Sequence, residues 1–187
     1  MEKHKTCSFF GHRKIDITNE LQYKLKEVIE DLIINQNTLT FLFGSQSDFD
    51  KLCHTVVTNL KKKYPKIKRI AYTCKNEKCI LEHEKEQWEK RLSLISNKTI
   101  QILSFDEEFE HSTKYTSGRS SYIERNQAMI NNSDICIFYY DNTYQPKTRK
   151  YYKHSNIYYQ PNSGTRLAFK YAEKKNKTII NIKEYLQ

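Results

Sequence analysis

Three short segments carry the residue types that bind phosphate groups, and each contains one of the chain's four glycines. They are Gly11-His12-Arg13, Gly44-Ser45-Gln46-Ser47 and Asn162-Ser163-Gly164-Thr165. Backbone N–H groups, hydroxyls and guanidinium groups donate hydrogen bonds to anions, and glycine lets a ligand approach the backbone. Taken singly, the hydroxyl residues fit ordinary helix N-caps as well. If the segments converge on one edge of the fold, they predict a phosphate site.

An alternation of apolar runs and amphipathic stretches predicts how these segments are positioned. The expected strands cover residues 6–10, 39–43, 67–73, 99–103, 134–140 and 178–182. The expected helices cover residues 18–34, 48–63, 80–95, 120–131 and 163–175. Such alternation favours one α/β domain over residues 1–187, with a doubly wound, mostly parallel sheet of about six strands and helices on both faces.

Carboxylates near these segments extend the candidate site. Ligands of an open parallel sheet bind beyond the carboxyl ends of its strands, where the three segments are expected. Asp141 follows the fifth expected strand, and a ribose hydroxyl contact suits it. Asp48 and Asp50 begin the helix after the second segment, and we expect Asp50 to orient that loop through backbone N–H bonds.

The composition leaves two interpretations of the charge. The chain has 187 residues and a formal net charge of +10, which suits a polyanionic partner. Codon drift onto solvated helix faces explains the charge at least as well. No apolar run approaches the roughly 20 residues of a membrane span. We therefore expect a cytoplasmic protein without membrane contact.

The cysteines indicate neither disulfides nor a metal. Five cysteines are an odd number, which argues against a disulfide framework. Cys74, Cys79 and His83 offer only three ligands and stand among lysines, so we expect no metal site. We also expect no cofactor.

A Tyr- and Lys-rich insertion at about residues 142–161 interrupts the alternation. Its length is unusual for a connection in a compact domain. Residues 150–153 and 156–160 have the aromatic content of a short hairpin. The insertion could be a lid that stacks on a base, a dimer arm, or codon-biased filler.

Four blocks, in order along nearly the whole chain, resemble the SLOG superfamily in its DUF1273/YpsA-like branch. The segment Thr6–Arg13 resembles the opening T-x-x-F-x-G-H-R of that branch, and Phe43–Asp50 resembles its second glycine loop. Asp50 and His54 echo an element of its DprA/Smf relatives. The helix-then-strand signature at residues 122–134, with Arg125 and Asn126, and the ending Ser163-Gly164-Thr165 complete the match.

The resemblance implies a Rossmann-like fold that binds nucleotides or nucleotide-derived ligands, some of them ADP-ribose-type or cyclic signals. The LOG branch of the superfamily comprises phosphoribohydrolases. In this chain Ala168 stands where their catalytic glutamate would be, and the second loop lacks their double glycine. Both departures argue against LOG-type hydrolysis, because the main catalytic carboxylate is missing. Asp50, Glu124 and Asp141 remain weak candidates for a catalytic role, which is otherwise unknown.

The sequence thus favours a protein that senses or sequesters a nucleotide-derived small molecule. One alternative is a nucleotide N-glycosidase or related hydrolase. A second alternative is a DprA-like binder of single-stranded nucleic acid. We favour a nucleotide-derived small molecule over nucleic acid as the partner. A homodimer is the default expectation for such a chain.

Overall fold

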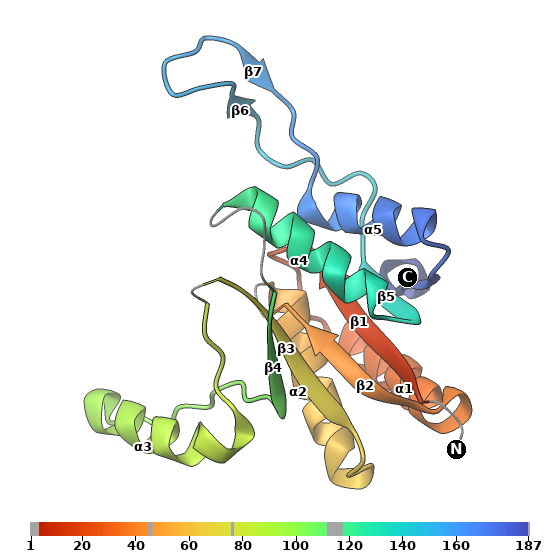
Figure 1. Cartoon of the computed structure of the whole chain (residues 1–187), viewed down its shortest axis with the longest axis vertical. Coiled ribbons are helices and arrows are strands. Elements are labelled where there is room, and N and C mark those ends of the chain that lie inside the picture. Colours follow the sequence, from red (N-terminus) through yellow and green to blue (C-terminus); the bar gives the residue numbers. More distant parts are fainter. Residues whose placement is uncertain (1–3, 45–46, 76, 112–117, 187) are drawn as a thin grey trace.

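Six parallel strands form the centre of the protein. The computed structural model describes residues 4–44, 47–75, 77–111 and 118–186. The sheet has the order β4-β3-β2-β1-β5-β8, with every neighbouring pair parallel (Figure 1). Its strands are β1 (Lys5–Gly11), β2 (Thr38–Phe43), β3 (Lys68–Cys74), β4 (Glu107–His111), β5 (Ile135–Tyr139) and β8 (Thr178–Asn181). The predicted Rossmann-like α/β fold is confirmed.

Helices cover both faces of this sheet, as predicted. One face packs against α1 (Asn19–Gln36) and α2 (Asp48–Lys63) in a core that includes a stack of Phe9, Phe41 and Phe43. The other face packs against α4 (Arg119–Asn131) and α5 (Gly164–Lys174). Successive residues of a strand point to opposite faces, so Phe9 enters the first core and Phe10 the second. This explains why β1 reads as a continuous apolar run.

Two boundaries differ from the sequence-based prediction. Residues 99–103 form no strand, and the fourth strand is the acidic segment Glu107–His111, which pairs with β3 from Ile70↔Glu107 to Cys74↔His111. The helix expected from residue 80 begins later, as the 3₁₀ turn η1 (Glu82–Glu84) and α3 (Lys85–Ser96). Leu81 is extended instead and forms an isolated parallel bridge with Phe105, whose N–H donates to the Ile80 carbonyl.

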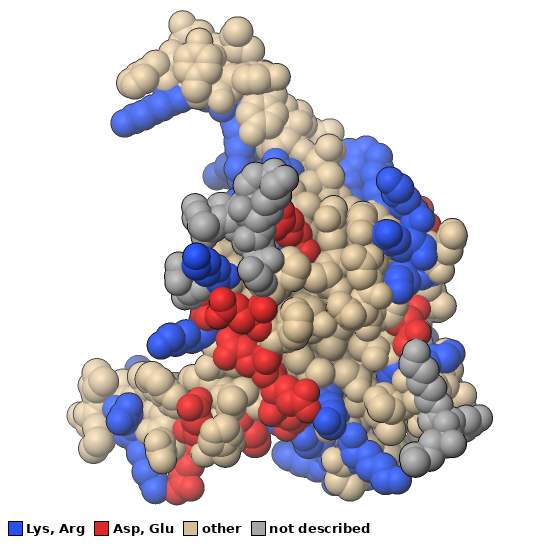
Figure 2. All heavy atoms as spheres, viewed as in Figure 1, with Lys and Arg blue, Asp and Glu red and all other residues tan. Residues whose placement is uncertain are grey.

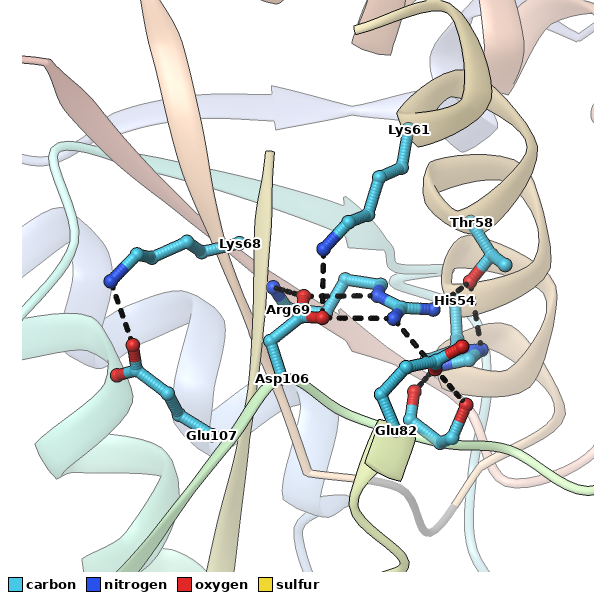
Figure 3. A network of polar contacts seen from close by, with 9 residues as sticks. His54, Thr58, Lys61, Lys68, Arg69, Glu82, Asp106 and Glu107 are labelled. Atoms are coloured by element: carbon cyan, nitrogen blue, oxygen red, sulfur yellow. Dashed lines mark hydrogen bonds and ion pairs between the residues drawn. The ribbon is translucent and has the colours of Figure 1, made fainter. Parts of the chain in front are cut away.

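A polar network anchors the β3 side of the sheet (Figure 3). The guanidinium of Arg69, with a side chain only 3% exposed, bonds both carboxylate oxygens of Asp106 and also Glu82. Burial alone would raise the pKa of Asp106, but hydrogen bonds from Arg69 and Lys61 lower it to about 2. The network therefore holds the loop before β4 against β3.

Residues 142–161, called the arm below, project from the body of the protein (Figure 1). The strands β6 (Arg149–Lys150) and β7 (Tyr158–Tyr159) pair antiparallel within it, so the predicted hairpin is confirmed with shorter strands. The short turn η2 (Ile182–Tyr185) follows β8. No helix in the described part of the chain has both the length and the apolar character that crossing a membrane requires.

Candidate ligand-binding site

A cavity of about 370 Å³ opens where the strand order reverses, beyond the carboxyl ends of β1 and β2. Strand β1 continues to β2 on one side and has β5 on the other, which is the position where doubly wound sheets bind ligands. All three predicted segments contribute to its wall. They supply Gly11, His12, Arg13, Gly44, Ser47, Asn162, Ser163, Gly164 and Thr165. Ser45 and Gln46 lie outside the described residues.

Two helices begin at this cavity with serine caps. Ser47 Oγ accepts a hydrogen bond from the Asp50 N–H at 3.0 Å, and the Asp50 carboxylate accepts from the Ser47 N–H at 3.3 Å. Ser163 caps α5 by accepting from the Arg166 N–H at 3.0 Å. The remaining N–H groups of a first helical turn, with the helix dipole, attract anions. The Asp50 carboxylate is thereby committed to capping α2.

Arg125 braces the loop after β2. Its side chain is buried, and its guanidinium donates to the Gly44 carbonyl at 3.0 Å. Glu77 lies 3.7 Å from the same guanidinium, which also stands over the Tyr122 ring. A Cβ on Gly44 would meet the guanidinium at 2.8 Å, so only glycine fits here without displacing Arg125. Asn126 lines the cavity and accepts a weaker hydrogen bond from Arg125.

Glycine occupies the other three positions for different physical reasons. A Cβ on Gly11 would lie 2.4 Å from the Phe49 Cβ, so this glycine admits the first turn of α2 against the end of β1. A Cβ on Gly164 would have no neighbour within 4 Å, so packing does not require glycine there. Gly118 caps α4 with a φ of 80°, which glycine adopts readily.

His12 faces the cavity as a neutral ring. It is buried, and its Nε2 accepts a hydrogen bond from the Asp141 N–H at 3.1 Å. Burial lowers the pKa of His12, although the Asp141 charge opposes this. The Tyr144 ring lies 4.2 Å away, between centroids. Because Nε2 accepts, the ring proton is on Nδ1, which leaves His12 a donor.

Asp141 does not line the cavity. Its carboxylate accepts hydrogen bonds from the backbone and hydroxyl of Thr143, which lower the pKa of Asp141. Its part in the site runs through its backbone N–H, which orients His12. A direct ribose contact is thus not supported by its position here.

Comparison with known protein families identifies the family of this chain. The YspA SLOG family matches residues 4–171. The chain belongs to this SLOG family. The predicted resemblance is therefore confirmed.

Two further comparisons each found a similar protein. The chain is 29% identical over 126 residues to the uncharacterized SPbeta prophage-derived protein YoqJ of Bacillus subtilis (strain 168), across 65% of this chain and 72% of that protein. Its fold is similar to DNA processing protein A from Helicobacter pylori, described for its single-stranded DNA binding mode. That match has a TM-score of 0.53 and 14% identity, and covers 94% of this chain but only 63% of the other. At this identity, the likeness shows the fold alone.

Within this SLOG domain, carboxylates are scarce at the cavity. Asp50 is the one acidic residue among the described residues that line it. Ala168, where the resemblance to LOG enzymes would place a glutamate, lies on α5 and is buried in the core. Glu124 is partly buried outside the cavity lining, and Asp48 pairs with Lys14 at 3.5 Å.

Sequence reasoning did not select several cavity residues. These are Arg119, Tyr122, Tyr144, Pro146 and Arg149. The first follows Gly118 at the start of α4, and its guanidinium donates to the Asn162 carbonyl at the start of α5. The last three belong to the arm, for which a lid that stacks on a base is one of the interpretations given above. An arginine directly after a helix-starting glycine was the one available signal.

Proposed function

We propose that this SLOG protein binds a nucleotide or a nucleotide-derived phosphorylated ligand in the cavity at the β1/β5 switch point. The SLOG assignment and the Rossmann-like fold agree with a role connected to nucleotides or nucleic acids. The convergence of three glycine-containing segments on one cavity carries the proposal. Its volume of about 370 Å³ lies within the range of small-molecule sites.

The charge around the cavity supports an anionic ligand. Arg13, Arg119 and Arg149 line it from three separate elements, and all three are exposed enough to reach a ligand. The opposing negative charge is that of Asp50, whose carboxylate accepts a hydrogen bond from the Ser47 N–H at the start of α2. Guanidinium groups bind phosphates through paired hydrogen bonds. We assign the phosphate to this arginine-rich side and the base to the Tyr144 and His12 rings.

We further propose binding without hydrolysis. The hydrolase alternative needs a carboxylate beside the ribose. The Asp50 carboxylate instead accepts hydrogen bonds from the N–H and the hydroxyl of Ser47. Recovering the bound ligand intact by chromatography supports sensing or sequestering. Release of a free base or of ADP-ribose supports the hydrolase alternative instead.

Calorimetry against a ligand panel tests the proposal. The panel contains ADP-ribose, cyclic ADP-ribose isomers, NAD and cyclic dinucleotides. For any ligand that binds, Arg13→Ala should weaken the affinity by about 1.5–3 kcal/mol, or about 10- to 150-fold, the range of a charged hydrogen bond. Lys14→Ala is the matched control, because Lys14 is the next residue yet does not line the cavity. Equal losses in both variants, or no binding across the panel, contradict the proposal.

We also propose a cytoplasmic homodimer. Helix α3 lies apart from the sheet (Figure 1) and exposes Leu94 and Ile95, at 81% and 83%, beside the half-exposed Trp88. Exposed apolar groups of this kind favour an interface. Five free cysteines, four of them buried, suit a reducing compartment.

A further inference from the structure

The arm combines exposed tyrosines with positive charge and contains no carboxylate. Its twenty residues, 142–161, contain five tyrosines and no Asp or Glu. Four cations accompany the tyrosines: Lys147, Arg149, Lys150 and Lys153. Figure 2 shows the tip of the arm without acidic side chains, whereas acidic side chains gather over β4 below it. Beyond Tyr144, Pro146 and Arg149, which line the cavity, the arm is therefore a further surface with its own chemistry.

The rings of the arm are held outward rather than packed inward. Tyr151, Tyr152 and Tyr158 are 70%, 67% and 58% exposed. The hairpin orders them, because Tyr151 meets Tyr159 edge-on at 5.3 Å and its N–H bonds the Ile157 carbonyl. Lys150 stands over the Tyr158 ring at 5.6 Å. A two-stranded hairpin is only marginally stable alone, so exposed rings in fixed positions point to a partner.

We propose that the arm binds a single strand of nucleic acid. Tyrosine faces stack on unpaired bases, and lysines beside them bind the phosphates that separate those bases. Tyr151, Tyr152 and Tyr158 provide the faces, and Lys147, Lys150 and Lys153 provide the charge. Contacts with base faces and phosphates do not depend on the sugar, so DNA and RNA strands bind comparably.

Charge decides against a second copy of the arm as the partner. Two arms placed together would oppose four cations with four cations and no carboxylate. A duplex is also disfavoured, because its bases are stacked on each other and cannot receive the tyrosines. This inference concerns a surface beyond the cavity and does not depend on the small-molecule ligand.

Fluorescence anisotropy with a labelled 20-nucleotide oligothymidylate tests the rings. Tyr151→Ala and Tyr158→Ala should each weaken binding by about 5- to 150-fold, the range for one stacked base. Tyr151→Phe should retain binding, because it keeps the ring face. Tyr185→Ala is the matched control, since Tyr185 is 52% exposed under Lys24 but lies outside the arm. Melting curves confirm that each variant is folded.

Salt dependence tests the charges. Neutralising three phosphates of a single strand, one for each lysine, gives a slope of about −2 for log K against log salt, or about 20-fold between 50 and 200 mM. The double variant Lys147→Gln, Lys153→Gln should reduce that slope by about 1.4. The double variant Lys62→Gln, Lys174→Gln removes equal charge from exposed helix positions and should leave the slope unchanged.

Several outcomes would overturn the inference. They are wild-type affinity in Tyr151→Ala, equal slopes in the two lysine variants, or a strong preference for duplex or for one sugar. Self-association lost in Tyr151→Ala, without oligonucleotide binding, would establish a dimer arm instead. Failure of the cavity proposal is distinguishable, because it removes nucleotide binding in the calorimetric panel and leaves the arm's anisotropy signal intact.

Discussion

The His54 ring predicts a loss of stability in mild acid. His54 lies on α2, is 4% exposed, and donates from Nε2 to the Ser104 carbonyl at 2.7 Å (Figure 3). Its Nδ1 is 3.5 Å from the Thr58 hydroxyl, which already accepts a hydrogen bond from Arg69. Burial, with the Arg69 charge, lowers the pKa of His54 from 6.5 to about 4. The ring is therefore neutral in the folded protein at pH 7.

The sign and size of the effect follow from proton linkage. Between pH 6.5 and about 4, the unfolded chain binds a proton that folded His54 does not bind. Stability is thus full above pH 6.5 and falls as the pH decreases through this window. The His54 contribution amounts to about 2 kcal/mol between pH 7.5 and 5.0, and to about 3 kcal/mol once both states are protonated.

Urea unfolding at pH 7.5, 6.5, 5.5 and 5.0 measures this loss. At a slope of about 2 kcal/mol/M, the wild-type midpoint should fall by about 1 M more than that of His54→Gln. Glutamine keeps an N–H donor but does not titrate, so the variant reports all other groups. The reasoning would be refuted if both proteins lost the same stability over this range.

Two other predictions follow from packing and exposure. Gly11→Ala should destabilise the protein by about 1–3 kcal/mol, because the added Cβ overpacks against Phe49. Gly164→Ala should be neutral or should stabilise α5 by up to about 1 kcal/mol. Thermal unfolding compares the two variants, and an equal loss of stability in both contradicts this account. Leu94→Glu should convert the proposed α3-mediated homodimer to a monomer in sedimentation velocity, and a wild-type monomer at 50 µM (about 1 mg/ml) contradicts that interface.

The order and type of the main helices and strands could be predicted from the hydrophobic pattern, because the central strands are continuous apolar runs. The apolar runs of β1, β2 and β5 are buried on both faces, which leaves few other interpretations. The fourth strand could not be found this way. Glu107, Glu108 and Glu110 are exposed at the sheet edge, where pairing with β3 selects the segment and apolar burial does not.

The candidate site was predictable as a meeting of segments but not in its detail. Topology alone brings the three glycine segments to the carboxyl edge. Glycine is needed at residue 11 because a Cβ there would clash with Phe49. Arg125 bonds the Gly44 carbonyl, which is 81 residues away in the sequence. Such long-range contacts leave no periodic signal. Arg119 of α4 and Arg149 of the arm were not selected for the same reason.

The central position of β1 has a consequence for synthesis of the chain. One edge of β1 pairs with β2 shortly after it, while the other waits for β5, whose Cys136 lies 128 residues beyond Ser8. A ribosome-bound chain that has reached β4 therefore presents an open, apolar strand edge, the kind of surface on which chains mispair. That interval ends when Ile135–Tyr139 has been synthesised and pairs with β1.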